Sequence, residues 1–223
     1  MNRLTNSFLL ALFFPTLSLA IIVGFDFPLE IFRTSGANLP YKVQMFAVLG
    51  VIISALSVNR SIRRWVALYT VMQKTRFVFT TPISDERRKR VGVYSISESV
   101  LLFVVGTTLF QLCHEAFICS MAFWFFSLEG LLFLVWGRKN YAVGLSSKAI
   151  IVADREVTVI YFSGLRKVSI SQQTLYFDYI ASLQLAFPVD CLPESSRKDF
   201  LVNLEKVTDK EKVLIQNLGL WKT

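Results

Sequence analysis

The sequence predicts an α-helical membrane protein with four transmembrane helices in two hairpins, followed by a small α+β domain. Three observations lead to this prediction. Apolar residues are concentrated before Trp136, although the whole chain is only 53% hydrophobic. A strongly basic connection lies between two of the apolar runs. After Lys139, long apolar runs give way to the alternation typical of strands. We therefore expect a transmembrane domain over residues 1–137 and a soluble domain over residues 138–223.

The stretch 59–90 determines the expected orientation of the chain. Only Asp85 and Glu86 oppose its nine basic residues, whereas the connection over residues 26–42 has only two basic residues. Lys and Arg in a short connection between spans resist translocation, so residues 59–90 are expected in the cytoplasm. Four spans then place both termini in the cytoplasm. The nine basic residues are Arg60, Arg63, Arg64, Lys74, Arg76, Arg87, Arg88, Lys89 and Arg90.

The first two spans are expected over residues 7–25 and 43–58. At 1.5 Å per residue, the first of these covers about 28 Å, close to the thickness of the hydrocarbon core. The alternative is a signal peptide cleaved after Ala20. The apolar run continues to Phe25 without a change of character, which favours a span. The second helix is expected to continue past Val58 into the basic stretch.

The basic residues that follow the second span and precede the third are expected at the level of the lipid headgroups. Arg60, Arg63 and Arg64 fall on one helical face, because their spacing is i, i+3, i+4. These residues either bind anionic lipid or serve only to determine topology. The expected headgroup-level set is Arg60, Arg63, Arg64, Arg87, Arg88, Lys89 and Arg90.

The last two spans are expected over residues 91–112 and 116–136. Thr81-Pro82 resembles an N-cap followed by proline at the first helical position, and it predicts the start of the third helix. A very short outer turn around His114 joins the two spans. Gly137 and the basic residues after it end the fourth helix on the cytoplasmic side.

Each of these two spans carries one carboxylate in its apolar sequence. Glu98 lies seven residues after Val91, and Glu129 lies seven residues before Trp136. Both are therefore expected about 10 Å from the same face of the membrane. A charge in hydrocarbon is costly, so such a residue suggests function. The two carboxylates share a proton or bind a cation, or each is protonated, reaches a basic partner such as Arg138, or contacts water.

The tail predicts an antiparallel meander of five or six short strands followed by two helices. The strands are expected near residues 149–152, 156–162, 165–171, 174–179 and 182–187. Phe200, Leu201, Leu204 and Val207 form the apolar stripe of the first helix. A capping box that begins at Thr208 predicts a second helix, which ends at Gly219.

This pattern resembles the small bacterial pleckstrin-homology-like (PH-like) domains, over about residues 140–207. The resemblance is carried by Leu185-Ala186-Phe187-Pro188, Leu192-Pro193 and Arg197-Lys198-Asp199-Phe200. The chain is more closely similar to YcxB-like membrane proteins, which place such a domain after transmembrane helices. The resemblance implies a curled sheet and a binding or scaffolding module without catalysis. Arg166 and Lys167 are candidates for surface contact with lipid heads, or they lie on a solvated strand edge.

Several functional classes find no support in the sequence. The net charge of +8 suggests nucleic acid, but most of the excess lies in the basic connection, so no nucleic acid partner is expected. Cys113, Cys119 and Cys191 have no CxxC spacing, which predicts free thiols and no metal site. His114 is the only histidine, and no nucleophile motif, phosphate-binding glycine loop or dinucleotide fingerprint is present. We therefore expect that the protein is not an enzyme and binds no cofactor.

Three functional hypotheses remain at this stage. The first is a multi-pass inner-membrane protein that presents a cytosolic interaction domain, as a scaffold, sensor or accessory subunit with an unknown membrane-protein partner. The second is a transport or ion-coupled subunit that uses Glu98 and Glu129. The third, a membrane enzyme, has the least support because a catalytic constellation is missing. Self-association is open, but no small-xxx-small motif favours it.

Overall fold

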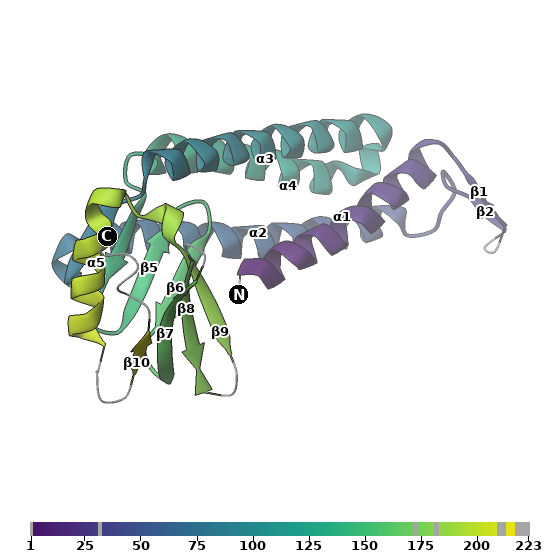
Figure 1. The fold of residues 1–223 in the computed structure, drawn as a ribbon. Coiled ribbons are helices and arrows are strands. Elements are labelled where there is room, and N and C mark those ends of the chain that lie inside the picture. The colour runs from purple at the N-terminus through teal and green to yellow at the C-terminus, as the bar shows by residue number, and fades with distance from the viewer. Residues whose placement is uncertain (1, 31–32, 172–173, 181–182, 209–212, 217–223) are drawn as a thin grey trace. The chain divides into compact units, whose positions relative to one another are not determined.

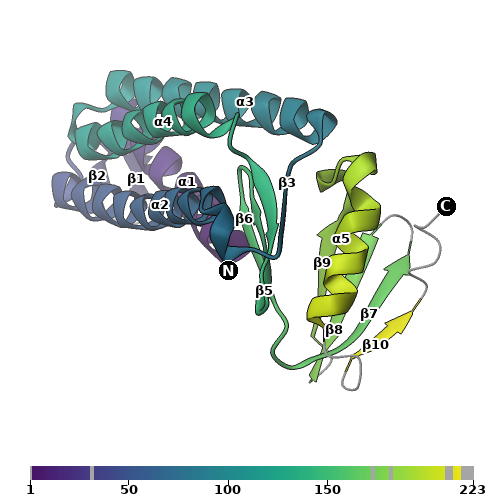
Figure 2. The same ribbon diagram turned by 90° about the vertical axis from the view of Figure 1, so that its left-hand side faces the viewer.

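The computed structural model describes residues 2–30, 33–171, 174–180, 183–208 and 213–216. The chain forms two compact units. The helical unit comprises Met1–Arg63 and Val93–Val135, and the sheet unit comprises Arg64–Gly92 and Trp136–Thr223. The division differs from the expected boundary after residue 137. The connection between the second and third long helices belongs to the sheet unit, because part of it is a strand, β3 (Figure 1 shows the whole fold, and Figure 2 labels this strand).

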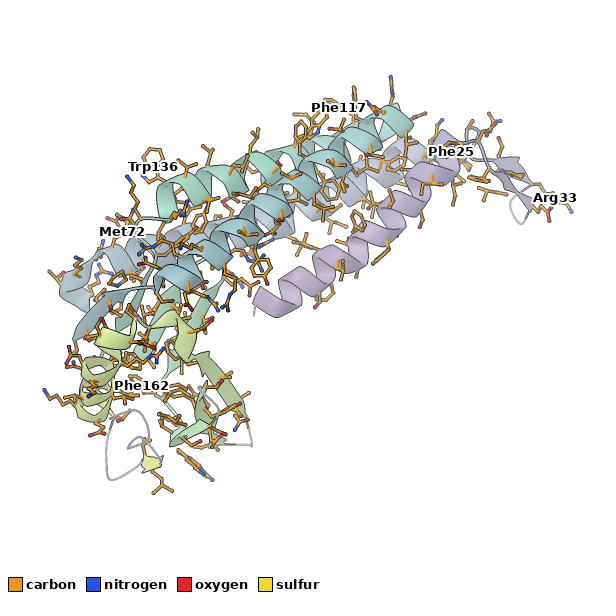
Figure 3. The ribbon with its side chains drawn as sticks, turned by 45° about the horizontal axis from the view of Figure 1, so that its top comes forward. Phe25, Arg33, Met72, Phe117, Trp136 and Phe162 are labelled. Atoms are coloured by element: carbon orange, nitrogen blue, oxygen red, sulfur yellow. The ribbon has the colours of Figure 1, made fainter. Side chains whose placement is uncertain are left out.

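Among the residues that the structure describes, four helices are long and apolar enough to cross a membrane. They are α1 (Asn2–Gly24), α2 (Lys42–Met72), α3 (Asp85–Leu112) and α4 (Phe117–Gly137). Figure 3 labels Phe117 and Trp136 at opposite ends of α4. The expected continuation of the second helix is confirmed, because α2 is one helix of 31 residues. The expected turn around His114 is a single turn of 3-10 helix, His114–Ala116.

Small residues and buried hydroxyls bring the helices of the helical unit together. A Cβ atom on Gly50 would lie 3.0 Å from the backbone nitrogen of Cys119, so α2 and α4 approach closely there. The Ser127 hydroxyl donates to the Ser99 carbonyl at 2.8 Å and links α4 to α3. Such contacts matter in an apolar solvent, where burial of apolar surface does not drive helices together. The core of this unit includes Ala20, Phe46, Ile53, Leu109, Cys119 and Phe123.

The connection between α1 and α2 contains a small hairpin. Strands β1 (Pro28–Leu29) and β2 (Thr34–Ser35) pair antiparallel, where the sequence predicted only a loop. Asp26 stabilises the base of the hairpin, because its carboxylate accepts a hydrogen bond from the Ala37 amide at 2.7 Å. Figure 3 shows Phe25 near the end of α1 and Arg33 farther along the hairpin.

The first sheet of the sheet unit is antiparallel, with strand order β3-β4-β5-β6. Its strands are β3 (Phe79–Pro82), β4 (Ala142–Leu145), β5 (Ala149–Ala153) and β6 (Val157–Tyr161). The predicted helix start at Thr81-Pro82 is wrong, because both residues belong to β3 and pair with β4. The edge position of β3 tolerates Pro82 at its end. Helix α3 begins at Asp85 instead.

The second sheet has the order β10-β7-β8-β9. Its strands are β7 (Leu165–Ser171), β8 (Thr174–Tyr179), β9 (Gln184–Pro188) and β10 (Leu214–Gln216). The predicted succession of short antiparallel strands is confirmed for β5 to β9, but it is divided between two sheets.

The predicted second helix is wrong for Leu214–Gln216, which pair parallel with β7. The apolar residues of this run add a strand at the edge of the sheet. Pairing with β7 therefore outweighs the helix prediction from the capping box that begins at Thr208. Residues 209–212, which hold most of the predicted capping box, and residues 217–223 lie outside the described part of the chain.

Helix α5 (Glu194–Val207) joins the two sheets. The ring of Phe200 lies 6.0 Å from the Phe79 ring of the first sheet and 5.6 Å from the Phe187 ring of the second. Leu201 and Leu204 are also fully buried, so the predicted apolar stripe of this helix is confirmed for these residues. Figure 2 shows α5 running along one side of the strands. The helix therefore closes the core of the unit.

Candidate functional site

The two carboxylates of the helical unit both contact one turn of α2. Glu98 on α3 forms an ion pair with Arg60, with 2.7 Å between Oε1 and Nη1. Glu129 on α4 is buried and accepts a hydrogen bond from the Ser61 hydroxyl at 2.7 Å. Arg60 and Ser61 are consecutive, so the structure brings together two carboxylates that are distant in the sequence. Helices α2, α3 and α4 thus meet at one group of polar side chains.

This contact changes the interpretation of Arg60. Glu98 lies seven residues into the apolar run that begins at Val91, or about 10 Å along the helix axis. The ion pair places the Arg60 guanidinium beside Glu98, so Arg60 has a carboxylate partner on α3 that the sequence did not predict. The side chains of Arg60 and Glu98 are 16% and 27% exposed, so both charges lie in a partly buried environment. Pairing lowers the cost of each charge there.

Small hydroxyl side chains are buried on the same two helices that carry Glu98 and Glu129. Ser95, Ser99 and Ser127 are all buried in the helical unit. The Ser99 hydroxyl lies against Gly130, where a Cβ atom would meet it at 2.7 Å. The close approach of α3 and α4 therefore depends on small residues. This arrangement gives the Glu98 and Glu129 carboxylates polar contacts with α2 and fixes the register of three helices.

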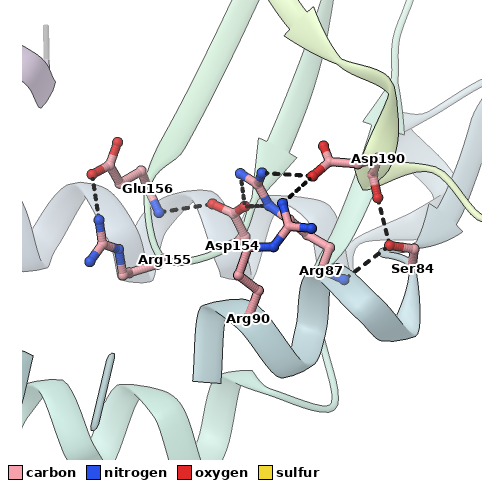
Figure 4. A network of polar contacts seen from close by, with 7 residues as sticks. All are labelled: Ser84, Arg87, Arg90, Asp154, Arg155, Glu156 and Asp190. Carbon is pink, nitrogen blue, oxygen red and sulfur yellow. Dashed lines mark hydrogen bonds and ion pairs between the residues drawn. The ribbon is translucent and has the colours of Figure 1, made fainter. Parts of the chain in front are cut away.

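A second charged network lies entirely within the sheet unit, and Figure 4 shows it. Arg87, in the first turn of α3, donates through Nε and Nη2 to one oxygen of Asp154, at 3.1 and 3.0 Å. Its Nη1 reaches Asp190 at 3.4 Å, and Arg90 donates to the same Asp190 oxygen at 2.9 Å. Asp154 follows β5 and is only 3% exposed. The network joins the start of α3 to two distant segments.

Backbone contacts reinforce the same junction. Ser84 is the helix cap in place of the predicted Thr81, because its hydroxyl accepts a hydrogen bond from the Arg87 amide at 3.2 Å. The Ser84 hydroxyl also donates to the Asp190 carbonyl at 2.6 Å. The Ser84 amide donates to the Cys191 carbonyl at 3.0 Å. The short 3-10 segment Val189–Cys191 is therefore attached directly to the N-terminus of α3.

Burial governs the electrostatics of this network. Burial alone would lower the pKa of Arg87, but the surrounding acidic groups outweigh it, and the pKa lies above its ordinary value. Burial raises the pKa of the Asp154 carboxyl, while the charge of Arg87 acts in the opposite direction. Burial also raises the pKa of the Cys191 thiol to about 12. Arg87 is therefore charged at every biological pH and requires an acidic partner at this position.

The other predicted basic residues have varied surroundings. Arg88 pairs with Asp85 at 2.9 Å on the helix surface. Arg64 is buried, Arg63 is half-buried and Lys89 is exposed. Arg166 and Lys167 lie on β7, and Lys167 pairs with β8 on one side and β10 on the other, so the interpretation as a strand edge is wrong for Lys167. A break in the β7–β8 register occurs at Arg166, between Leu165 and Lys167.

Sequence reasoning missed Asp154 and Asp190. Asp154 lies in the interval between two predicted strands, and Asp190 lies between two prolines in a segment without a predicted role. Their partner Arg87 is 67 and 103 residues away, and no local spacing signals such a pair. Within the described ranges, no group of His, Cys, Asp and Glu side chains is arranged to hold a metal ion. Comparisons with protein-family models, curated proteins and solved structures gave no match.

Proposed function

We propose that this chain is a multi-pass protein of a bacterial inner membrane that presents a PH-like interaction domain to the cytosol. In this role it acts as a scaffold, a sensor or an accessory subunit of a membrane complex. Both termini are cytosolic in this proposal. The sheet unit contacts the partner. The long helices anchor the sheet unit to the membrane and transmit its conformational changes.

The pairing of β3 with β4 is the observation that carries this proposal. Strand β3 comes from the connection between α2 and α3, and β4 follows α4. Two segments of one sheet lie on the same side of a membrane, so α3 and α4 form a hairpin that leaves and returns to that side. The nine basic residues of the stretch 59–90 favour the cytosolic side.

The composition of the sheet unit supports the PH-like assignment. Strands β3 to β9 form two consecutive sheets and are followed by helix α5, after which β10 joins the second sheet. The Phe200 side chain of that helix contacts both sheets.

Exposed apolar side chains gather at one end of the two sheets and support a role in protein contact. Tyr161, Ile180 and Leu183 are each more than half exposed. They lie close together, because the Ile180 amide donates to the Gly164 carbonyl and the Tyr179 amide donates to the Leu183 carbonyl. The Tyr179 hydroxyl also donates to the Tyr161 carbonyl. Such clusters on a soluble surface often mark an interaction site.

Membrane-impermeant thiol labelling of intact spheroplasts tests the orientation. Single cysteines replace Lys89 in the basic connection, Arg166 in the sheet unit and Arg33 in the hairpin of the other connection. Because Cys113, Cys119 and Cys191 are buried, their background labelling is expected to be low. We expect labelling only at position 33 until the membrane is permeabilised. Labelling at position 89 or 166 in intact spheroplasts would contradict the proposal.

Purification from native membranes in polymer-bounded discs tests the interaction. We expect Ile180→Asp to remove a co-purifying protein. Val202→Asp is the matched control, because Val202 is an exposed apolar residue on α5 outside this cluster. Equal recovery of every partner from both variants would contradict a role for the cluster.

Ion-coupled transport is the second candidate, and the contact of both carboxylates with one turn of α2 favours it. Proteoliposomes with an internal pH dye and an imposed potassium diffusion potential test this function. Under this candidate, Glu98→Gln and Glu129→Gln abolish proton uptake while the protein still inserts. Under the first proposal, neither variant changes the pH signal, and both act only on stability through the contacts with Arg60 and Ser61.

A further inference from the structure

The two carboxylate oxygens of Asp190 are unequally satisfied. Oδ2 accepts hydrogen bonds from Arg90 at 2.9 Å and from Arg87 at 3.4 Å. Oδ1 is buried and has no hydrogen-bond partner within the described part of the chain. A buried carboxylate oxygen without a donor costs free energy, and this cost opposes the present position of the Asp190 side chain. The Asp190 side chain is also 36% exposed, so water can reach its ion pair with Arg90.

Arg90 lies where a lipid headgroup phosphate can compete with Asp190 for its guanidinium group. It is the last charged residue before the apolar run of α3 that begins at Val91, and its side chain is 51% exposed. Headgroup phosphates lie at this depth when the run spans a bilayer, and guanidinium groups bind phosphate in a bidentate manner. An ion pair that is half exposed contributes little to stability. A phosphate can therefore replace Asp190 as the partner of Arg90.

Arg87 differs from Arg90 in this respect. Its main partner, Asp154, is almost fully buried and receives two hydrogen bonds from it. An ion pair with a buried partner is expensive to break, because the remaining charge loses its compensation. The Arg87–Asp154 pair therefore keeps the start of α3 attached to the turn after β5 while Arg90 exchanges partners. The network combines one permanent contact with one exchangeable contact.

We propose that Arg90 exchanges Asp190 for the phosphate of an anionic phospholipid, and that this exchange loosens Val189–Cys191 from the N-terminus of α3. Asp190 then turns its free oxygens toward water. The Ser84 contacts with residues 190 and 191 weaken, and this segment lies immediately before α5. The inference rests on the proposed membrane insertion and names an anionic lipid headgroup as the ligand of the sensor.

Hydrogen exchange of the full-length protein in nanodiscs tests this inference. The reporter is the Ser84 amide, which donates to the Cys191 carbonyl, and the internal reference is the Ile83 amide, which donates to the Tyr141 carbonyl. We expect exchange at Ser84 to be about fivefold faster in phosphatidylglycerol-containing discs than in phosphatidylcholine discs, the effect of one basic residue at an anionic surface. Exchange at Ile83 should not change.

Two variants and one control make the test specific. Arg90→Gln and Asp190→Asn should each make Ser84 exchange the same in both lipids, because the exchangeable pair is gone. Lys89→Gln removes the same charge one residue earlier from an exposed side chain, and it should keep the lipid dependence of the native protein. Equal loss of the dependence in Lys89→Gln and Arg90→Gln would overturn the inference in favour of a general surface-charge effect.

A third condition identifies the source of the phosphate. Inorganic phosphate added to phosphatidylcholine discs should leave Ser84 exchange unchanged, and a full response to it would overturn the lipid assignment. An unchanged Ser84 rate between the two lipids, in protein that is inserted in the discs, would overturn the inference but not the proposed function. Failure to insert would instead contradict the proposed function itself.

Discussion

The charge of Asp154 is expected to hold the start of α3 in place, and Asp154→Asn removes that charge with little change of shape. The substituted amide keeps an oxygen that can accept the hydrogen bond from the Glu156 amide, which Asp154 Oδ1 accepts at 2.9 Å. Removing one partner from a buried ion pair costs about 3–5 kcal/mol. Because Arg87 is 25% exposed and keeps Asp190 as a second partner, we expect the low end, about 3 kcal/mol.

Hydrogen exchange of the full-length protein in phosphatidylcholine nanodiscs measures this loss. Local opening that becomes easier by about 3 kcal/mol accelerates exchange by roughly two powers of ten, and we expect this at the Ser84 and Arg88 amides. Asp85→Asn is the matched control, because it breaks the surface ion pair with Arg88 in the same helical turn. An exposed pair of this kind contributes about 0–1 kcal/mol.

A second comparison separates the pair from its surroundings. Arg87→Met combined with Asp154→Leu removes both charges and retains apolar volume, so it should be closer to the native protein than Asp154→Asn. If Asp154→Asn and Asp85→Asn accelerate exchange equally little, the buried pair does not hold α3, and the reasoning fails.

Three further predictions concern other parts of the chain. Phe200→Ala should destabilise the sheet unit by about 3–5 kcal/mol, because both sheets lose a buried ring contact. Chemical unfolding of the full-length protein, followed by hydrogen exchange of the β7 and β8 amides, measures this loss. A loss of stability confined to α5 would contradict the prediction. Cys191 should react with maleimide only after unfolding, because its thiol is buried and its pKa is raised to about 12. The folded state then retains a proton that the unfolded state releases near its ordinary pKa of 9.0, so stability should fall as the pH rises from about 9 to about 12. Gly36→Ala should displace the β1–β2 hairpin, because the Cβ atom of the alanine would lie 1.9 Å from the Ile22 carbonyl oxygen. An unchanged rate of hydrogen exchange at the amide of position 36 would refute this.

Local sequence patterns predicted much of the architecture. The four long helices follow from apolar runs, and the turn at His114 from the short interval between two of them. Strands β5 to β9 follow from alternating and β-branched residues, and α5 from its apolar stripe. Each of these signals is read within one element, where neighbouring residues determine which face is buried.

Contacts between distant segments could not be predicted in the same way. Strand β3 is short, includes proline and exists because β4 offers it a partner 60 residues later. The strand β10 forms because the edge of β7 is available, although the local signals favoured a helix. Arg60 was predicted at the headgroup level, and only Glu98 on another helix reveals that it pairs beside the apolar run.

The sequence alone determined which segments are apolar helices, which are strands and where the positive charge accumulates, because these properties depend on neighbouring residues. Only the tertiary structure decided that the basic connection contributes a strand to the sheet unit and that Arg60, Arg87 and Arg90 pair with carboxylates distant in the sequence. Coulombic and hydrogen-bond partners are selected by distance in space, and a separation of 67 or 103 residues along the chain carries no trace of that distance.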